Sequence, residues 1–102
     1  MSRTPPQKTS SASTPSFYCY IVQCSDGSYY TGWSTDPMRR EKRHNQGQGA
    51  RYTRSRRPVT LVYVESQPDR STAMKREVCI KNMTRQKKQK LIEQGQRTLK
   101  DA

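Results

Sequence analysis

Acidic residues are scarce in this chain of 102 residues: 8 Asp and Glu stand against 20 Lys and Arg, which leaves a net charge of +12. Such an imbalance attracts a polyanion, most simply a nucleic acid, or an acidic membrane surface. Long apolar runs are also missing, since none reaches even ten residues. We therefore expect no membrane-spanning helix, and no secretory signal, because the N-terminus has no apolar segment.

Cysteine is sparse and odd in number. Cys19, Cys24 and Cys79 cannot all pair with one another, and none belongs to a CxxC motif. Cys19 and Cys24 point to opposite faces of one regular strand, so together with His44 they lack the ligand spacing of a zinc site. We expect small, reduced core thiols in a cytoplasmic protein, associated with the nucleoid in a bacterium, or in a nuclear protein of eukaryotic or viral origin.

Aromatic side chains are lacking from residues 1–16, where Ser, Thr and Pro dominate. This composition cannot bury surface and predicts a disordered N-terminal arm. Because Arg3 and Lys8 carry only two of the positive charges, the remainder of the chain is itself basic. Its length allows one domain, which we place at residues 17–94, followed by a flexible tail over residues 95–102.

A hairpin is predicted by the segment YCYIVQCSDGSYYTG, because aromatic and β-branched residues flank Ser-Asp-Gly. A three-residue loop ending in a left-handed glycine places Val22 opposite Tyr30 and Tyr20 opposite Gly32. Both tyrosines then share one face, and the glycine leaves space beside a phenol. A two-residue loop would separate them. We predict the three-residue loop; paired tyrosines also stabilise hairpins without any chemistry.

A basic helix is predicted next, with Asp36 as its N-cap and Pro37 at its first position. Its basic side chains form two neighbouring stripes, Arg40 with His44 and Arg39 with Arg43. Few apolar residues anchor this helix, so a solvated basic face is the simpler interpretation of the helix alone.

Four arginines surround Tyr52 in the segment GQGARYTRSRRP, for which we expect a loop or a short helical turn. They are Arg51, Arg54, Arg56 and Arg57. Basic residues around an aromatic ring suit phosphate contacts combined with base stacking. A solvated charged loop is the alternative, although four such charges repel one another when no anion is present. Residues 59–65 then predict a third strand, in which Val59, Leu61 and Tyr63 alternate with the residues between them.

Glu77 falls in the middle of the apolar face of the following helix, which Asp69 or Ser71 caps and which extends through Met83. Ala73, Met74 and Ile80 share that face. A carboxylate is seldom buried there unless it is paired or bound to a cation, and Lys81, one turn on, offers an ion pair as the alternative. A last helix, capped by Thr84, is expected to reach about Glu93 and to stop at Gly95.

Tyr18-Cys19-Tyr20, followed by Tyr30-Thr31-Gly32, resembles the paired motifs of the GIY-YIG nuclease domain. The resemblance covers residues 17–92 and matches Arg40, His44 and Glu77 to the family's arginine, histidine and metal-binding glutamate. HNQGQGARYTRSRRPVTLVY is similar to small stand-alone members and to the domain of eukaryotic nucleases that cut branched DNA. The implied fold is α/β, with a small three-stranded antiparallel sheet flanked by helices.

The resemblance also implies chemistry: a structure-directed DNA endonuclease of repair or recombination that hydrolyses phosphodiester bonds with Mg²⁺ or Mn²⁺. Tyr30 would take the water proton, Tyr20 would position water or phosphate, and Arg40 would hold the scissile phosphate. Mg²⁺ often takes only one or two protein carboxylates. Six of the eight acidic residues lie in turns, caps, element ends or the tail, which leaves Glu41 and Glu77. Glu77 suits the ion better, because it alone sits on a well-defined apolar helix face. We expect nearby cations, namely Arg40, His44 and the metal, to lower the tyrosine pKa from about 10.

Two positions depart from the family pattern. Trp33 replaces a smaller aliphatic residue and either crowds the mouth of the site or offers a stacking surface. Glu41 stands at a position that is usually apolar, and no family role is assigned to Asn82. Two alternatives to the nuclease remain open. A catalytically silent nucleic-acid-binding module would use the same basic surface, and a basic ribosome-associated protein explains the charge but not Glu77 or the tyrosine spacing.

Overall fold

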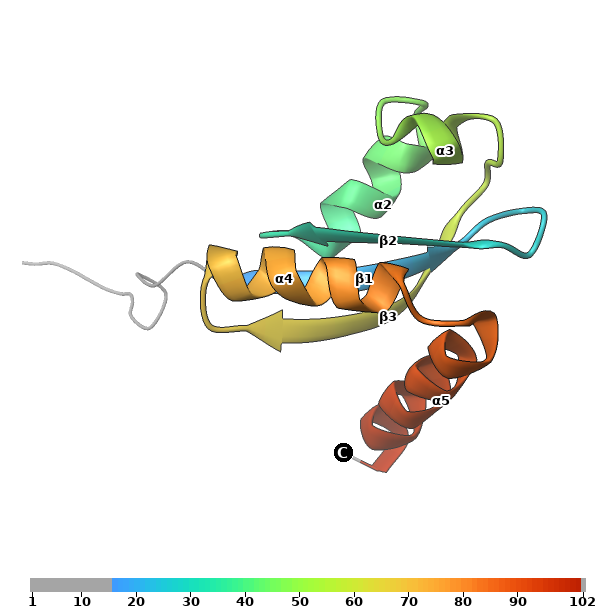
Figure 1. Ribbon diagram of the computed structural model, residues 1–102. Helices are drawn as coiled ribbons and strands as arrows, with labels where there is room; N and C mark the ends of the chain where they lie inside the picture. The colour runs from blue at the N-terminus through green and yellow to red at the C-terminus, as the bar shows by residue number, and fades with distance from the viewer. Residues whose placement is uncertain (1–15, 102) are drawn as a thin grey trace, which may run out of the picture.

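The computed structural model describes residues 16–101 of the chain, with side chains for residues 16–95. Its elements are β1 (Phe17–Gln23), β2 (Tyr29–Ser34), α2 (Pro37–Asn45), α3 (Arg51–Arg54), β3 (Thr60–Gln67), α4 (Arg70–Lys81) and α5 (Arg85–Asp101). The predicted α/β fold is confirmed: three antiparallel strands in the order β2-β1-β3 are flanked by helices (Figure 1). The predicted arm lies outside the described residues except for Ser16.

The helices cover both faces of the sheet. α2 and α3 lie on one side, whereas α4 and α5 lie on the other (Figure 1). The core on the α2 side consists of Tyr20, Val22, Cys24 and Val59, and the core on the α4 side of Cys19, Ile21, Ala73, Ile80 and Ile92. β1 therefore buries both of its faces, which confirms its predicted central place. Each buried aliphatic side chain contributes about 1.5–3 kcal/mol to folding.

The hairpin has the predicted register. Tyr20 pairs with Gly32, and Val22 pairs with Tyr30. The N–H of Cys24 donates to the carbonyl of Ser28 at 2.8 Å, which closes the three-residue loop, and the glycine at its end has a φ of 86°. Local turn chemistry alone therefore determined which face carries the two tyrosines.

The helix starts are the ones that capping chemistry predicts. The Asp36 carboxylate accepts the N–H of Arg39 at 3.2 Å, and the Asp69 carboxylate accepts the N–H of Thr72 at 2.7 Å, which decides between Asp69 and Ser71. The Thr84 hydroxyl accepts the N–H of Lys87 at 3.2 Å. The Arg-rich segment contains the short helix α3.

The alternation predicted along the third strand is wrong. β3 runs over Thr60–Gln67, and a register irregularity pairs Ile21 with Tyr63 but Val22 with Leu61. Val62 is therefore the extra residue of a bulge, and Leu61 and Tyr63 face opposite sides of the sheet. Glu41 of α2 binds the strand just before this bulge, because its carboxylate accepts the N–H of Leu61 at 2.6 Å.

Two expectations about the last helices are also wrong. Met74 does not join the apolar face of α4, since 48% of it is exposed, and α4 ends at Lys81 rather than Met83. α5 does not stop at Gly95 but continues to Asp101. The glycine serves packing rather than termination: a Cβ at this position would lie 2.9 Å from the ring of Tyr63, so the missing side chain lets the helix approach β3.

All three thiols are free, and Cys79 is exposed rather than in the core as expected. Burial, with a smaller effect of Glu65, raises the pKa of Cys19 to about 11. No group of three or more His, Cys, Asp or Glu in the described part of the chain could hold a metal ion. Nor does any described helix have the length and apolarity needed to cross a membrane.

Candidate active site

The Tyr20 ring lies across Gly32, as the register requires. Tyr20 is 1% exposed, and a Cβ added to the glycine would come within 2.5 Å of its hydroxyl oxygen. The gap in β2 is thus filled by the phenol, and any larger residue at this position would displace it.

A buried chain of hydrogen bonds runs from this phenol into α3. The Tyr20 hydroxyl lies 3.0 Å from Nε2 of His44, and Nδ1 of His44 lies 2.8 Å from Oγ1 of Thr53. The Thr53 hydroxyl donates its one proton to the carbonyl of Ala50 at 2.9 Å, so toward the imidazole it must accept. We therefore assign the proton of His44 to Nδ1, so that Nε2 accepts from Tyr20; the N–H of Ala50, 3.4 Å from Nδ1, is the one contact that favours the other tautomer among the described residues.

Burial keeps both members of this pair uncharged. It is the main cause that lowers the pKa of His44 below its ordinary value, and Arg40 adds to the effect. Burial also raises the pKa of Tyr20, followed by the influence of Tyr30. The expected lowering of the tyrosine pKa by His44 is therefore absent in this arrangement, because the neutral imidazole supplies no positive charge.

Tyr30 is held by rings on two sides. Its centroid lies 5.4 Å from that of His44, edge to face, and 6.2 Å from that of Tyr52, stacked. Burial raises the pKa of Tyr30, and the charge of Glu77 raises it further, while Arg40 acts in the opposite direction. The phenol of Tyr30 is therefore protonated at neutral pH, and neutralising the charge of Glu77 would remove only the smaller of the two effects that raise its pKa.

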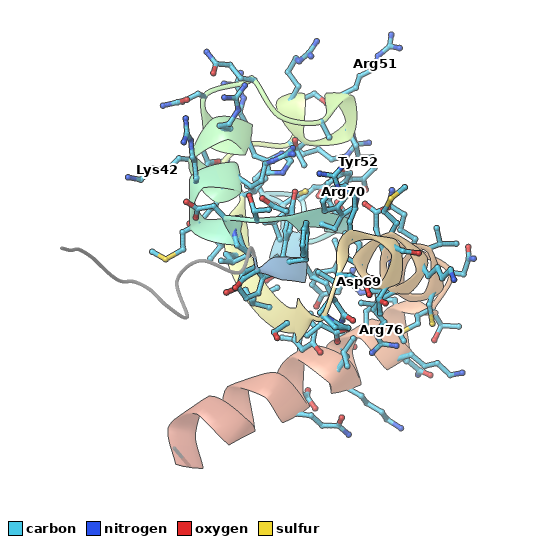
Figure 2. All side chains as sticks on the ribbon, turned by 90° about the vertical axis from the view of Figure 1, so that its left-hand side faces the viewer. Lys42, Arg51, Tyr52, Asp69, Arg70 and Arg76 are labelled. Carbon is cyan, nitrogen blue, oxygen red and sulfur yellow. The ribbon has the colours of Figure 1, made fainter. Side chains whose placement is uncertain are left out.

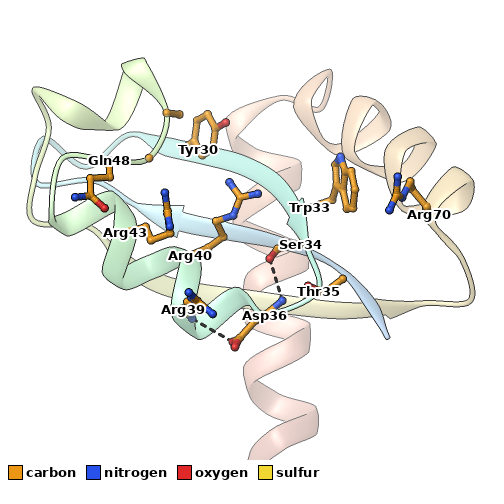
Figure 3. A pocket seen from close by; sticks show the side chains of 12 residues that line it. Tyr30, Trp33, Ser34, Thr35, Asp36, Arg39, Arg40, Arg43, Gln48 and Arg70 are labelled. Carbon is orange, nitrogen blue, oxygen red and sulfur yellow. Dashed lines mark hydrogen bonds between the residues drawn. The ribbon is translucent and has the colours of Figure 1, made fainter. Parts of the chain in front are cut away.

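A basic groove of about 640 Å³ crosses the free edge of β2. Tyr30 enters it from the α2 face of the sheet and Trp33 from the α4 face, because their positions on the strand differ by three, an odd number. Its basic side chains are Arg39, Arg40 and Arg43 from α2 and Arg70 from α4. In Figure 3, Arg40 lies between Tyr30 and Trp33. The three predicted arginines of α2 are therefore brought together with Tyr30.

Glu77 occupies the predicted position between the buried Ala73 and Ile80, and its side chain is 19% exposed. Lys81 Nζ lies 3.8 Å from its carboxylate and 5.7 Å from the centroid of Tyr30. The charge of Glu77 raises the pKa of Tyr20 as well as that of Tyr30, so it acts on both phenols. The ion pair proposed as the alternative thus exists, but it is long.

Two of the four loop arginines are used by the fold. The Arg56 guanidinium stacks 3.9 Å from the centroid of Tyr52 and forms a 3.2 Å ion pair with Asp26 in the hairpin turn. Arg57 donates to the carbonyls of Arg54 at 2.9 Å and Asn45 at 3.3 Å. These partners remove much of the expected repulsion. Arg51 and Arg54 are exposed, and Figure 2 shows Arg51 pointing away from the body of the protein.

Sequence reasoning missed Thr53, Lys81 as a neighbour of Tyr30, and Arg70. Arg70 had a usable signal: it is the first residue of α4, where the helix dipole disfavours a cation, so a basic residue there needs another reason. Thr53 had none, because only the fold places it beside His44.

The chain matches the family model of the GIY-YIG catalytic domain over residues 16–90. A UPF0213 protein of Haloquadratum walsbyi is 56% identical over 78 residues, which cover 76% of this chain and 88% of the relative. A UPF0213 protein of Staphylococcus aureus is 56% identical over 79 residues, 78% of this chain and 96% of the relative.

Two solution NMR structures are similar. One, of a UPF0213 protein from Bacillus halodurans, has 45% identity and a TM-score of 0.50, and the match covers 76% of this chain and 83% of that one. The other, of a protein from E. faecalis, has 40% identity and a TM-score of 0.54, with 79% and 86% covered. The names of these relatives state no activity.

Proposed function

The chain belongs to the GIY-YIG family, a superfamily of endonucleases, and we propose that it is a divalent-metal-dependent DNA endonuclease directed by DNA structure. One observation carries the proposal: Tyr30 and Arg40 line one basic groove, and the charge of Glu77 acts on Tyr30 and on the buried Tyr20. A binding surface needs the basic groove but not a half-buried carboxylate beside two phenols. Cleavage of this kind serves DNA repair or recombination in the cytoplasm or nucleus.

The side chains fit a Mg²⁺ or Mn²⁺ ion held by a single carboxylate. Three other carboxylates already have partners. Glu41 accepts the N–H of Leu61, Glu65 forms an ion pair with Arg76 at 2.6 Å, and Asp26 forms an ion pair with Arg56. Asp36 and Asp69 cap helices. Among the described residues Glu77 has one charged partner, Lys81 at 3.8 Å, and waters with a substrate phosphate can complete the shell of such an ion. Next to Tyr30 on β2, the buried hydroxyl of Thr31 has no hydrogen-bond partner among the described residues.

The chain's own residues divide the work. Arg40 binds the scissile phosphate, and Arg39 and Arg43 bind the phosphates beside it. Tyr30, whose ring lines the groove, takes the proton of the attacking water once its own phenolic proton has passed to solvent. Tyr20 is buried and donates to His44, so it does not contact the substrate directly. It helps to position water or phosphate by keeping the neighbouring side chains of the site in place. The bound ion supplies positive charge that neutralises Glu77, polarises water and stabilises the transition state.

A catalytically silent DNA-binding module is the second candidate. The Glu77–Lys81 ion pair favours it, because a paired carboxylate needs no metal. The raised pKa of Tyr30 is consistent with it as well. Both candidates share the groove and its arginines.

The deciding experiment incubates the protein with end-labelled branched and linear DNA, with Mg²⁺, with Mn²⁺ and with chelator. We expect nicks near the branch in the presence of either ion and none with chelator. Tyr30→Phe, purified in parallel, controls for contaminating nucleases, because only a hydroxyl is removed. Binding of both DNAs without cleavage under any condition would leave the binding module as the function.

A further inference from the structure

Trp33 is the one tryptophan of the sequence, and it has one side in the core and one in the groove. It packs against the core on the α4 side, where the Phe17 ring lies 6.4 Å away at a 46° tilt. The same residue lines the groove beside Arg40 (Figure 3). A purely structural tryptophan would not need to line the groove that holds the phosphate-binding arginines.

Arg70 completes an aromatic and cationic surface at this end of the groove. Its guanidinium lies 5.7 Å from the Trp33 centroid, and the residue is exposed. It stands at the first position of α4, and the carboxylate of the adjacent Asp69 caps Thr72. A guanidinium that faces a tryptophan in a groove lined by other arginines is placed to contact a nucleotide, since it can bind phosphate and stack on a base.

The opposite end of the groove does not offer the same contact. The Tyr30 ring packs against two other rings, edge to face with that of His44 and stacked with that of Tyr52. Tyr52 carries the Arg56 guanidinium at 3.9 Å. Trp33 is thus the ring of the groove that lies beyond Arg40 and away from this packed group (Figure 3).

We propose that Trp33 and Arg70 form a stacking site for one unpaired base of the DNA strand whose phosphate Arg40 holds. The proposal rests on the proposed function in assigning that phosphate to Arg40. A base inside a duplex is stacked on its neighbours and cannot also lie on a protein ring unless it is unpaired or flipped out. The site therefore selects DNA with an unpaired nucleotide next to the bound phosphate, as at a branch or a single-stranded end.

The test uses the intrinsic fluorescence of Trp33, which no other tryptophan obscures. Glu77→Gln protein without metal is titrated with oligo-dT, with a blunt duplex, and with the same duplex carrying a single-stranded branch. Stacking of a base quenches tryptophan emission, so we expect strong quenching by oligo-dT and by the branched duplex and weak quenching by the blunt duplex at equal occupancy. Equal quenching by all three DNAs, or none, would overturn the proposal.

Variants give a second measurement that does not depend on fluorescence. By anisotropy of labelled DNA, Arg70→Ala and Trp33→Ala should reduce the preference for branched over blunt DNA about tenfold, the effect expected for one stacked base. Arg54→Ala, an exposed arginine outside the groove, should weaken binding of both DNAs equally and keep the preference. If Trp33→Ala unfolds because it leaves Phe17 unsupported, Arg70→Ala decides alone, and an unchanged preference there refutes the site.

This outcome is separable from that of the cleavage assay, because binding is measured without metal. If DNA with unpaired bases selectively quenches Trp33 but the protein never cuts DNA, the stacking site is supported and the nuclease function is rejected. If the protein cuts DNA but every DNA quenches Trp33 equally, the nuclease function is supported and the stacking site is rejected.

Discussion

The hydroxyl of Tyr20 lies 3.0 Å from Nε2 of His44, and both side chains are buried between the sheet and α2. The two residues come from different elements, and neither is charged at neutral pH. Their contact continues through Nδ1 to Thr53 and so ties the hairpin to α3. The candidate site is therefore ordered by a neutral hydrogen-bonded chain rather than by an ion pair.

Thr53→Val should weaken this chain, because it leaves the Nδ1 proton of His44 without an acceptor. We expect the free energy of unfolding to fall by about 1–3 kcal/mol, as for an unsatisfied buried donor. The imidazole should shift its proton to Nε2, since the N–H of Ala50 lies 3.4 Å from Nδ1 and can then donate to it. Long-range ¹H–¹⁵N spectra report the tautomer. Thr60→Val, at an exposed strand position, is the matched control, and an Nε2-protonated wild type would contradict the assignment.

The stability of the protein should decrease as the pH falls through the range below about 6.5. The pKa of His44 is lowered in the folded state, so the unfolded chain binds a proton at a higher pH than the folded chain does. The stabilisation is complete above the unfolded pKa and decreases below it, with a limiting slope of about 1.4 kcal/mol per pH unit for one group. His44 is the one histidine, so thermal melts between pH 7.5 and 5.5, with its NMR signals, check this directly. A melting temperature that does not change over this range would show that the imidazole is not kept neutral by the fold.

Glu77→Gln should separate the two candidate functions. If the carboxylate holds a metal, cleavage falls by orders of magnitude, while DNA binding without metal stays equal or rises slightly because one negative charge is gone. If Glu77 serves only Lys81, the change mainly lowers the melting temperature. Glu93→Gln removes the same charge from an exposed site on α5 and should change neither property. Cleavage that survives Glu77→Gln would remove this residue from the chemistry.

The salt dependence of DNA binding should locate the phosphate-binding residues. Arg39→Ala with Arg43→Ala should reduce the slope of log affinity against log salt by up to about 0.9 for each duplex phosphate that is no longer neutralised. Arg56→Ala should act differently, since it frees Asp26 and uncovers Tyr52, and so should lower stability more than it lowers the slope. Fluorescence anisotropy at several salt concentrations, with thermal melts of each variant, measures both effects. An unchanged slope for the α2 pair would place the phosphates elsewhere.

The sequence by itself determined the features that depend on neighbours along the chain. The hairpin register followed from one turn, the start of α2 from Asp36, and the position of Glu77 between Ala73 and Ile80 from helical periodicity. These are short-range effects of backbone geometry and capping, which operate before any tertiary contact exists. They were sufficient to bring Tyr20 and Tyr30 to one face.

Tertiary structure decided whatever depended on partners distant in the chain. The bulge at Val62 reversed the faces of β3, and Gly95 packs closely on Tyr63 instead of ending α5. Arg56 has a partner, Asp26, that lies far earlier in the chain, and Thr53 is a partner of His44 because α3 packs on α2. Such contacts depend on which surfaces meet in the folded state, and neither residue spacing nor local propensity encodes that meeting.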